Sequence, residues 1–173
     1  MRLFTALWVP PAAAAALRAV TGSAAVPPGW RAVHPQTWHL TLAFHGEAEP
    51  EQLAPALYTA AFGTPAPRLR LSGAGSFRGV HWVGVEADPV DRLHALVVAA
   101  GGDPAEFVPH VTLLRRRGRG REPSPVRPPW AEHHGPWWRP ANVLLVRSEP
   151  GRGGPGQGGS HYRVVHRVPL GPS

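Results

Sequence analysis

The chain has 173 residues and a mass of 18.5 kDa, a size that suits one compact domain or two small lobes sharing a core. It contains no cysteine, which excludes disulfide scaffolds, thiolate metal sites and cysteine nucleophiles. The formal net charge is +7, and all 18 lysine-or-arginine positions are arginine, whose planar guanidinium suits phosphate. No apolar run reaches the ~18 residues of a membrane span, and the first residues are too strand-like for a signal peptide. We therefore expect a cytoplasmic protein.

Strands and helices alternate along the chain, and several strands follow one another directly. The first helix opens at Pro10-Pro11, and the second begins among the acids at 47–51, where Pro55 should be tolerated only in a first turn. This order predicts an α+β protein with mixed or antiparallel sheets. The predicted strands are 2–9, 30–34, 37–45, 67–76, 80–86, 107–114, 141–148 and 161–168, and the predicted helices are 12–20, 51–62 and 88–100.

Two segments late in the chain have unusual compositions. A glycine-rich turn at 150–160 joins the last two strands as a hairpin. An arginine-rich loop is predicted at 115–128, opposed only by Glu122. It is either a solvated loop or a contact for a nucleic-acid backbone. Its arginines are Arg115, Arg116, Arg117, Arg119, Arg121 and Arg127.

A short element occurs twice in predicted strands. The tetrapeptide 39–42 reads His-Leu-Thr-Leu, and 110–113 reads His-Val-Thr-Leu. Side chains alternate across a strand, so each copy places its His and Thr on one face and its aliphatic pair on the other. The aliphatic pair anchors the strand in a core. If the two halves pack about a pseudo-twofold axis, two imidazoles and two hydroxyls meet in one cleft.

Two imidazoles and two hydroxyls suit phosphodiester chemistry. In-line displacement at phosphorus needs a base on the attacking oxygen and an acid on the leaving oxygen, and histidine serves as either near neutral pH. Threonine hydroxyls can donate to the non-bridging oxygens, and no metal is needed. The alternative is that each His-x-Thr segment is only a hydrogen-bonded structural pair, which is the commoner role of such a segment when it occurs once.

At these residues the chain resembles the 2H phosphoesterase superfamily, and within it the RNA 2′,3′-cyclic phosphodiesterase branch, also called 2′-5′ RNA ligase. The paired motif carries the resemblance, and the flanking segments support it. The matching segments are 1–7, 38–46, 109–113, 147–149 and 162–170.

The resemblance implies one bilobal domain over 1–173, with two pseudo-symmetric α+β lobes and an active-site cleft between their sheets. It implies hydrolysis of an RNA terminal 2′,3′-cyclic phosphate to a 2′-phosphomonoester, with 2′-5′ ligation as the reverse reaction. His39 would be the proton donor and His110 the proton acceptor, while Thr41 and Thr112 would hold phosphate oxygens. It implies a monomer without metal or cofactor that acts on RNA ends, tRNA fragments among them, and binds no membrane.

Other residues are weaker candidates. His45 lies on the same predicted strand as His39 and, six residues on, could border the cleft, and Arg78 and Arg115 flank it. His133-His134 lacks the i, i+4 spacing of a helical zinc site. Several aromatic side chains could stack a base, although core packing is their commoner role. They are Trp38, Phe77, Trp82, Trp130, Trp137 and Trp138.

Two alternatives remain open on the sequence alone. A 2H-type enzyme could act on small cyclic nucleotides instead of RNA. The basic loop and the seven tryptophans could also belong to an RNA-binding module without catalysis.

Overall fold

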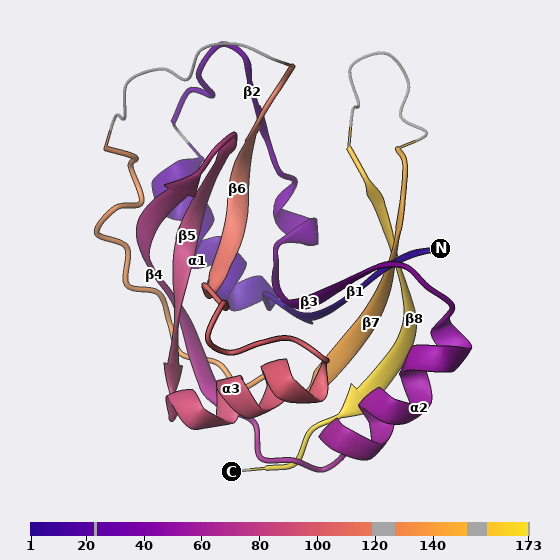
Figure 1. Cartoon of the computed structure of the whole chain (residues 1–173). Helices are drawn as coiled ribbons and strands as arrows, with labels where there is room; N and C mark the ends of the chain where they lie inside the picture. Colours follow the sequence, from indigo (N-terminus) through magenta and orange to yellow (C-terminus); the bar gives the residue numbers. More distant parts are fainter. Residues whose placement is uncertain (23, 119–126, 152–158, 173) are drawn as a thin grey trace.

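Two four-stranded antiparallel sheets and three helices form the protein, as seen in the computed structural model (Figure 1), which describes residues 1–22, 24–118, 127–151 and 159–172. The expected α+β fold is confirmed. The elements are β1 (Arg2–Trp8), α1 (Pro11–Thr21), β2 (Trp30–Ala32), the 3-10 turn η1 (Pro35–Thr37), β3 (His39–Glu47), α2 (Pro50–Ala61), β4 (Arg68–Phe77), β5 (Val80–Asp88), α3 (Val90–Ala99), β6 (His110–Arg116), β7 (Asn142–Glu149) and β8 (His161–Pro169).

The sheets divide the chain into two lobes. Sheet A has the strand order β3-β1-β7-β8, and sheet B has the order β2-β6-β5-β4. In Figure 1 sheet B lies on the left with α1 behind it, sheet A lies on the right with α2 along β8, and α3 crosses the lower end. The N-terminal strand thus pairs with β7, near the C-terminus, so both halves of the sequence build sheet A.

The aliphatic residues of the two repeated tetrapeptides anchor their strands in the core. Leu40 and Leu42 of β3 are 1% and 3% exposed, and Val111 and Leu113 of β6 are 1% and 4% exposed. They belong to one apolar cluster shared by both sheets and the helices. Burial of such side chains contributes about 1.5–3 kcal/mol each. The predicted anchoring is confirmed, and it turns the His and Thr of each copy away from the core.

A β-bulge follows the first tetrapeptide. In the β1–β3 pairing Ala6 faces Thr41 but Thr5 faces Ala43, which leaves Leu42 as an extra residue on β3. A bulge makes two consecutive side chains lean to one face, so the strict alternation of faces ends there. Leu42 is buried and Ala43 packs against the same core cluster.

An equivalent bulge follows the second tetrapeptide. In the β5–β6 pairing Trp82 faces Thr112 but His81 faces Leu114, which leaves Leu113 as the extra residue on β6. Leu113 is buried and Leu114 packs against the core. The two motif strands therefore share a local irregularity as well as a sequence.

Three expectations about local structure were wrong. Arg115 and Arg116 belong to β6, because Arg31 and Trp30 of β2 pair with them, so the predicted loop starts later. The strand predicted at 30–34 ends at residue 32 and gives way to η1. Helix α2 continues through Pro55 beyond its first turn. Arg119 and Arg121 lie outside the described residues.

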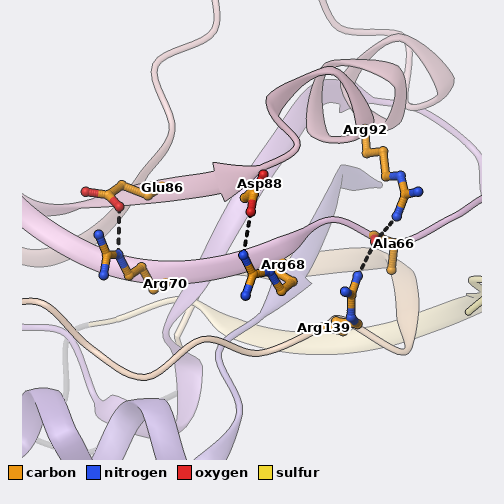
Figure 2. A network of polar contacts seen from close by, with 7 residues as sticks. All are labelled: Ala66, Arg68, Arg70, Glu86, Asp88, Arg92 and Arg139. Atoms are coloured by element: carbon orange, nitrogen blue, oxygen red, sulfur yellow. Dashed lines mark hydrogen bonds and ion pairs between the residues drawn. The ribbon is translucent and has the colours of Figure 1, made fainter. Parts of the chain in front are cut away.

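Several arginines are used to hold the edge of sheet B together (Figure 2). Arg68 pairs with Asp88 at 2.5 Å and Arg70 pairs with Glu86 at 2.6 Å across the β4–β5 ladder. Both guanidiniums lie over the Trp137 ring, at 4.8 and 4.6 Å from its centroid. Exposed pairs of this kind contribute at most about 1 kcal/mol each. Arg92 and Arg139 both donate to the Ala66 carbonyl.

Candidate active site

A cleft of about 1640 Å³ lies between the two sheets and contains both histidine motifs. His39 and Thr41 line it from sheet A, and His110 and Thr112 line it from sheet B. The four residues come from strands far apart in sequence, and the two buried aliphatic pairs described above fix their direction. The site residues expected from the sequence therefore share one cavity.

Both imidazoles are held by the same hydrogen bond. The Nδ1 of His39 lies 2.6 Å from the Thr37 carbonyl oxygen, and the Nδ1 of His110 lies 2.7 Å from the Val108 carbonyl oxygen. A carbonyl oxygen only accepts, so Nδ1 carries the hydrogen in both rings. The Nε2 atom of each ring is left to exchange protons with a substrate. In both cases the carbonyl lies two residues before the histidine.

The surroundings of the first histidine are aromatic and bury most of its ring. The His39 ring stacks on Phe4 at 5.0 Å and on Trp8 at 4.9 Å, and Tyr162 meets it edge-on at 5.2 Å. Burial is the largest cause that lowers the pKa of His39 from 6.5 to about 4, while the hydrogen bond to Thr37 acts in the opposite direction. His39 is therefore neutral at pH 7 in the free protein.

The second histidine is more open. Its neighbour across the β5–β6 ladder is Gly84, which has no side chain to cover it. Phe77 meets His110 edge-on at 4.9 Å, and Trp82 lies at 5.7 Å from it. Burial is again the largest cause that lowers the pKa of His110, opposed by the hydrogen bond to the Val108 carbonyl. The two motifs are therefore alike in sequence and in hydrogen bonding, but the side chains around the two histidines differ.

Arg115 brings positive charge to both histidines. It lines the cleft, and its charge contributes to lowering the pKa of His39 and the pKa of His110. It reaches this face because of the bulge at Leu113, which returns the fifth residue after the histidine to the cleft. An anion bound there would reverse the effect on both imidazoles. The sequence-based suggestion that Arg115 flanks the cleft agrees with this position.

Bulges in β3 also decide that Phe44 lines the cleft and that the candidate His45 does not. Phe44, the fifth residue after His39, lines the cleft and is 80% exposed. His45 is the extra residue of a second bulge, between the pairs formed by Phe44 and Gly46. Its ring bonds the buried Thr5 hydroxyl at 2.8 Å and does not line the cleft. The expectation from simple alternation was therefore wrong.

Most of the aromatic candidates pack elsewhere. Trp38 and Trp130 are buried in the core, and Trp137 lies beneath Arg68 and Arg70. Of the six aromatic candidates only Phe77 lines the cleft, and Trp82 touches His110 from beside it. Arg78 does not line it.

Several functional neighbours escaped the sequence analysis. Phe4 and Trp8 flank His39 from β1, and Tyr162 reaches it from β8. The alternation of Phe4, Ala6 and Trp8 on the first strand was a visible signal of one aromatic face. Nothing in the sequence linked that face to the first histidine, because their contact depends on β1–β3 pairing.

Within the described residues no three His, Asp or Glu side chains are grouped so that they could hold a metal ion. The helices of that same part of the chain are each too short or too polar to cross a bilayer. His134, one of the two adjacent histidines, bonds the Ser72 hydroxyl at 2.9 Å.

Comparisons with known proteins agree with this geometry. A family model described as LigT-like phosphoesterase matches residues 7–84. A Thermus thermophilus protein named RNA 2′,3′-cyclic phosphodiesterase is 35% identical over 174 residues, which cover 86% of this chain and 82% of that protein.

Solved structures share the whole fold. A chain from Thermus thermophilus has a TM-score of 0.71 and 31% identity, covering 99% of both chains. E. coli LigT in its apo form has a TM-score of 0.72 and 28% identity, covering 98% of this chain and 97% of that chain. E. coli LigT complexed with 3′-AMP has a TM-score of 0.70 and 27% identity, covering 98% and 96%. On the family model and on 35% identity over most of both sequences, this chain belongs to the LigT-like phosphoesterase family of the 2H superfamily.

Proposed function

We propose that the protein hydrolyses the 2′,3′-cyclic phosphate at the end of an RNA to a 2′-phosphomonoester. The observation that carries this proposal is the matched pair of imidazoles, each with Nδ1 held by a carbonyl and both lining one cleft. The Thermus thermophilus relative named RNA 2′,3′-cyclic phosphodiesterase supports the reaction, and E. coli LigT complexed with 3′-AMP supports a nucleotide ligand.

In the proposed reaction a water oxygen attacks phosphorus while its proton passes to Nε2 of His110. The bond between phosphorus and O3′ breaks, and O3′ takes a proton from Nε2 of the His39 imidazolium. The products are a 2′-phosphate and a 3′-hydroxyl, and proton exchange with solvent restores both rings. Proton transfer by a placed side chain contributes typically ~10²–10⁴-fold.

His39 must take up the proton that it later donates from solvent when the substrate binds. In the free protein burial lowers its pKa to about 4. A phosphate monoanion beside the ring favours the imidazolium and raises that pKa. His39 would therefore become charged only in the complex, together with its substrate.

The remaining groups would stabilise the phosphate. Thr41 and Thr112 line the same cleft and would donate their hydroxyls to non-bridging oxygens. Arg115 would supply positive charge to the pentacoordinate phosphorus, where the two non-bridging oxygens carry the negative charge. None of these roles requires a metal ion.

Ligation follows from the same arrangement. A 5′-hydroxyl in place of water attacks phosphorus and loses its proton to His110, while the bond between phosphorus and O3′ breaks and O3′ takes a proton from His39, which leaves a 2′-5′ phosphodiester and a 3′-hydroxyl. Hydrolysis dominates wherever water outcompetes the second RNA end.

Fragments of tRNA with cyclic phosphate ends are natural candidates among the RNA substrates. We also propose that the protein acts as a monomer.

A nucleoside 2′,3′-cyclic phosphate in excess EDTA tests the proposal. We expect turnover to the 2′-phosphate, and a loss of roughly 10²–10⁴-fold in kcat for His39→Gln and for His110→Gln. His45→Gln is the matched control, because His45 lies on the same strand but does not line the cleft. Turnover that disappears with EDTA, or that survives both substitutions, would overturn the proposal. RNA binding without any product would indicate a non-catalytic binding module.

A further inference from the structure

Three arginines share the wall of the cleft formed by β2, β6 and the residue that follows β6. Arg31 lies directly opposite Arg115 in the β2–β6 ladder, and Arg117 follows two residues later. All three line the cleft. Like charges placed directly opposite each other destabilise an antiparallel pair. The arrangement therefore costs stability unless an anion lies against it.

No carboxylate neutralises this group within the described residues. None of the three forms an ion pair there, whereas Arg68 and Arg70 on β4 each have a carboxylate partner (Figure 2). Among the described residues that line the cleft, Glu149 is the one acid, and it pairs with Arg147 at 3.0 Å. The charge on the β2–β6 wall is therefore available to a ligand.

The group extends away from the reacting centre. Arg115 is the member whose charge reaches both histidines. Arg117 lies roughly 7 Å beyond it, just past the end of β6, and Arg31 lies about 5 Å to the side on the edge strand β2. The distance of roughly 7 Å from Arg115 to Arg117 is close to the separation of successive phosphates in an extended RNA strand. A phosphate at Arg115 would thus place the next one near Arg31 and Arg117.

We propose that Arg31 and Arg117 form a second phosphate subsite that binds the phosphodiester on the 5′ side of the terminal nucleotide. This inference rests on the proposed function and narrows its substrate class to RNA oligonucleotides, because a mononucleotide has no such phosphodiester. Guanidinium groups donate two parallel hydrogen bonds to phosphate oxygens, which a point charge cannot do. Occupation of the subsite also relieves the repulsion between Arg31 and Arg115.

Three substrates isolate the contribution of the extra phosphate. They are adenosine 2′,3′-cyclic phosphate, the dinucleotide ApA with a 2′,3′-cyclic phosphate, and the same dinucleotide with an uncharged methylphosphonate linkage. We expect the charged dinucleotide to exceed the methylphosphonate about tenfold in kcat/KM. Its log–log dependence on salt should be steeper by about 0.7, the value for one phosphate contact on a single strand.

The variant Arg31→Gln/Arg117→Gln tests the residues. We expect the charged and uncharged dinucleotides to become equal within about twofold, with turnover of the mononucleotide unchanged. Arg18→Gln removes the same kind of charge from an exposed position on α1 outside the cleft, and should leave every ratio as in the wild type. A dinucleotide ratio that survives the double substitution would overturn the subsite. An equal loss on the mononucleotide would also overturn it, because the arginines would then act on the reacting phosphate alone.

Failure of the proposed function would be seen separately. If the wild type turns over none of the three substrates, the proposed hydrolase activity is wrong. The subsite is then tested by equilibrium binding of the dinucleotide 2′-phosphate with each linkage. Tighter binding of the charged linkage, lost in the double variant, supports the subsite, and equal binding of both linkages contradicts it.

Discussion

The two histidines differ at the scale of single residues although their motifs are alike. His39 packs between aromatic rings and has a pKa lowered to about 4, whereas His110 faces a glycine. Burial opposes the charged form of each ring, and the hydrogen bonds to backbone carbonyls offset only part of that effect. Desolvation therefore has the largest influence on the pKa of each ring, and with it on which imidazole is charged and which is neutral.

The pH dependence of the reaction should reflect these two groups. The profile of kcat/KM reports the free protein, where the pKa of His39 is about 4 and that of His110 is below 6.5. We expect a bell with its maximum below pH 6.5 and a decline at higher pH. The profile of kcat should lie at higher pH, because a bound phosphate favours imidazolium. Steady-state kinetics from pH 4 to 9 measures both, and a kcat/KM profile that is flat or rises above pH 7 would contradict it.

Trp8 should act as a positioning residue that shields the His39 ring from solvent. Because Trp8 stacks on His39 at 4.9 Å, Trp8→Leu should admit water and raise the pKa of His39 from about 4 toward 6.5. An NMR titration of the His39 Cε1 proton measures this change directly. Phe62→Leu is the control, since Phe62 is 53% exposed and stacks on Tyr58 away from the cleft. A titration identical in wild type and Trp8→Leu would show that the indole does not set the pKa.

At the scale of elements, the two bulges decide which side chains reach the cleft. Leu42 and Leu113 are the extra residues, and each reverses the alternation that follows its motif. Phe44 and Arg115 then occupy equivalent positions on opposite walls. One wall thus offers an exposed ring and the other a guanidinium, so the two walls of the cleft differ in chemistry.

The β4–β5 hairpin should control the position of Trp82 beside His110. A Cβ atom at Gly75 would lie 2.2 Å from the Trp82 ring, so Gly75→Ala must displace the indole. Trp82 lies 5.7 Å from His110, and we expect kcat to fall about ten- to a hundredfold. Near-UV circular dichroism would report the moved indole in the same sample. Ser76→Ala, the next residue of β4, should leave both readouts unchanged, and normal kcat with an altered tryptophan signal would refute the coupling.

At the scale of the whole molecule, partly buried histidines lower stability in acid. Burial lowers the pKa of His39, His45, His110 and His133, so the unfolded chain binds more protons than the folded protein below pH 6.5. Stability from these groups is fully present above the unfolded value of 6.5 and is lost as the pH falls through the folded values. All four groups act in the same direction.

Urea unfolding at pH 7 and at pH 4 measures this effect. We expect the free energy of unfolding to fall with pH, with His39 accounting for about 3 kcal/mol of the decrease as the pH approaches its folded pKa of about 4. His39→Gln removes the titrating group, so the decrease in that variant should be smaller by that amount. Equal decreases in both proteins would show that His39 titrates normally in the folded state.

The sequence determined the fold class, the strands that carry the motifs and the four residues that meet in the cleft. Those properties depend on local patterns: alternation with period two anchors Leu40 and Val111, and turns and the prolines at the helix starts delimit the elements. The repeated tetrapeptide could be recognised because both strands use the same local pattern.

Only the tertiary structure decided which neighbours each histidine has. Whether a strand bulges depends on its pairing partner, and the bulges place Arg115 in the lining of the cleft and His45 outside it. Arg116 joined a strand because β2, far away in sequence, pairs with it. The low pKa of His39 arises from rings on β1 and β8 that only folding brings together. Desolvation and pairing are properties of three-dimensional contacts, and no local pattern of residues encodes them.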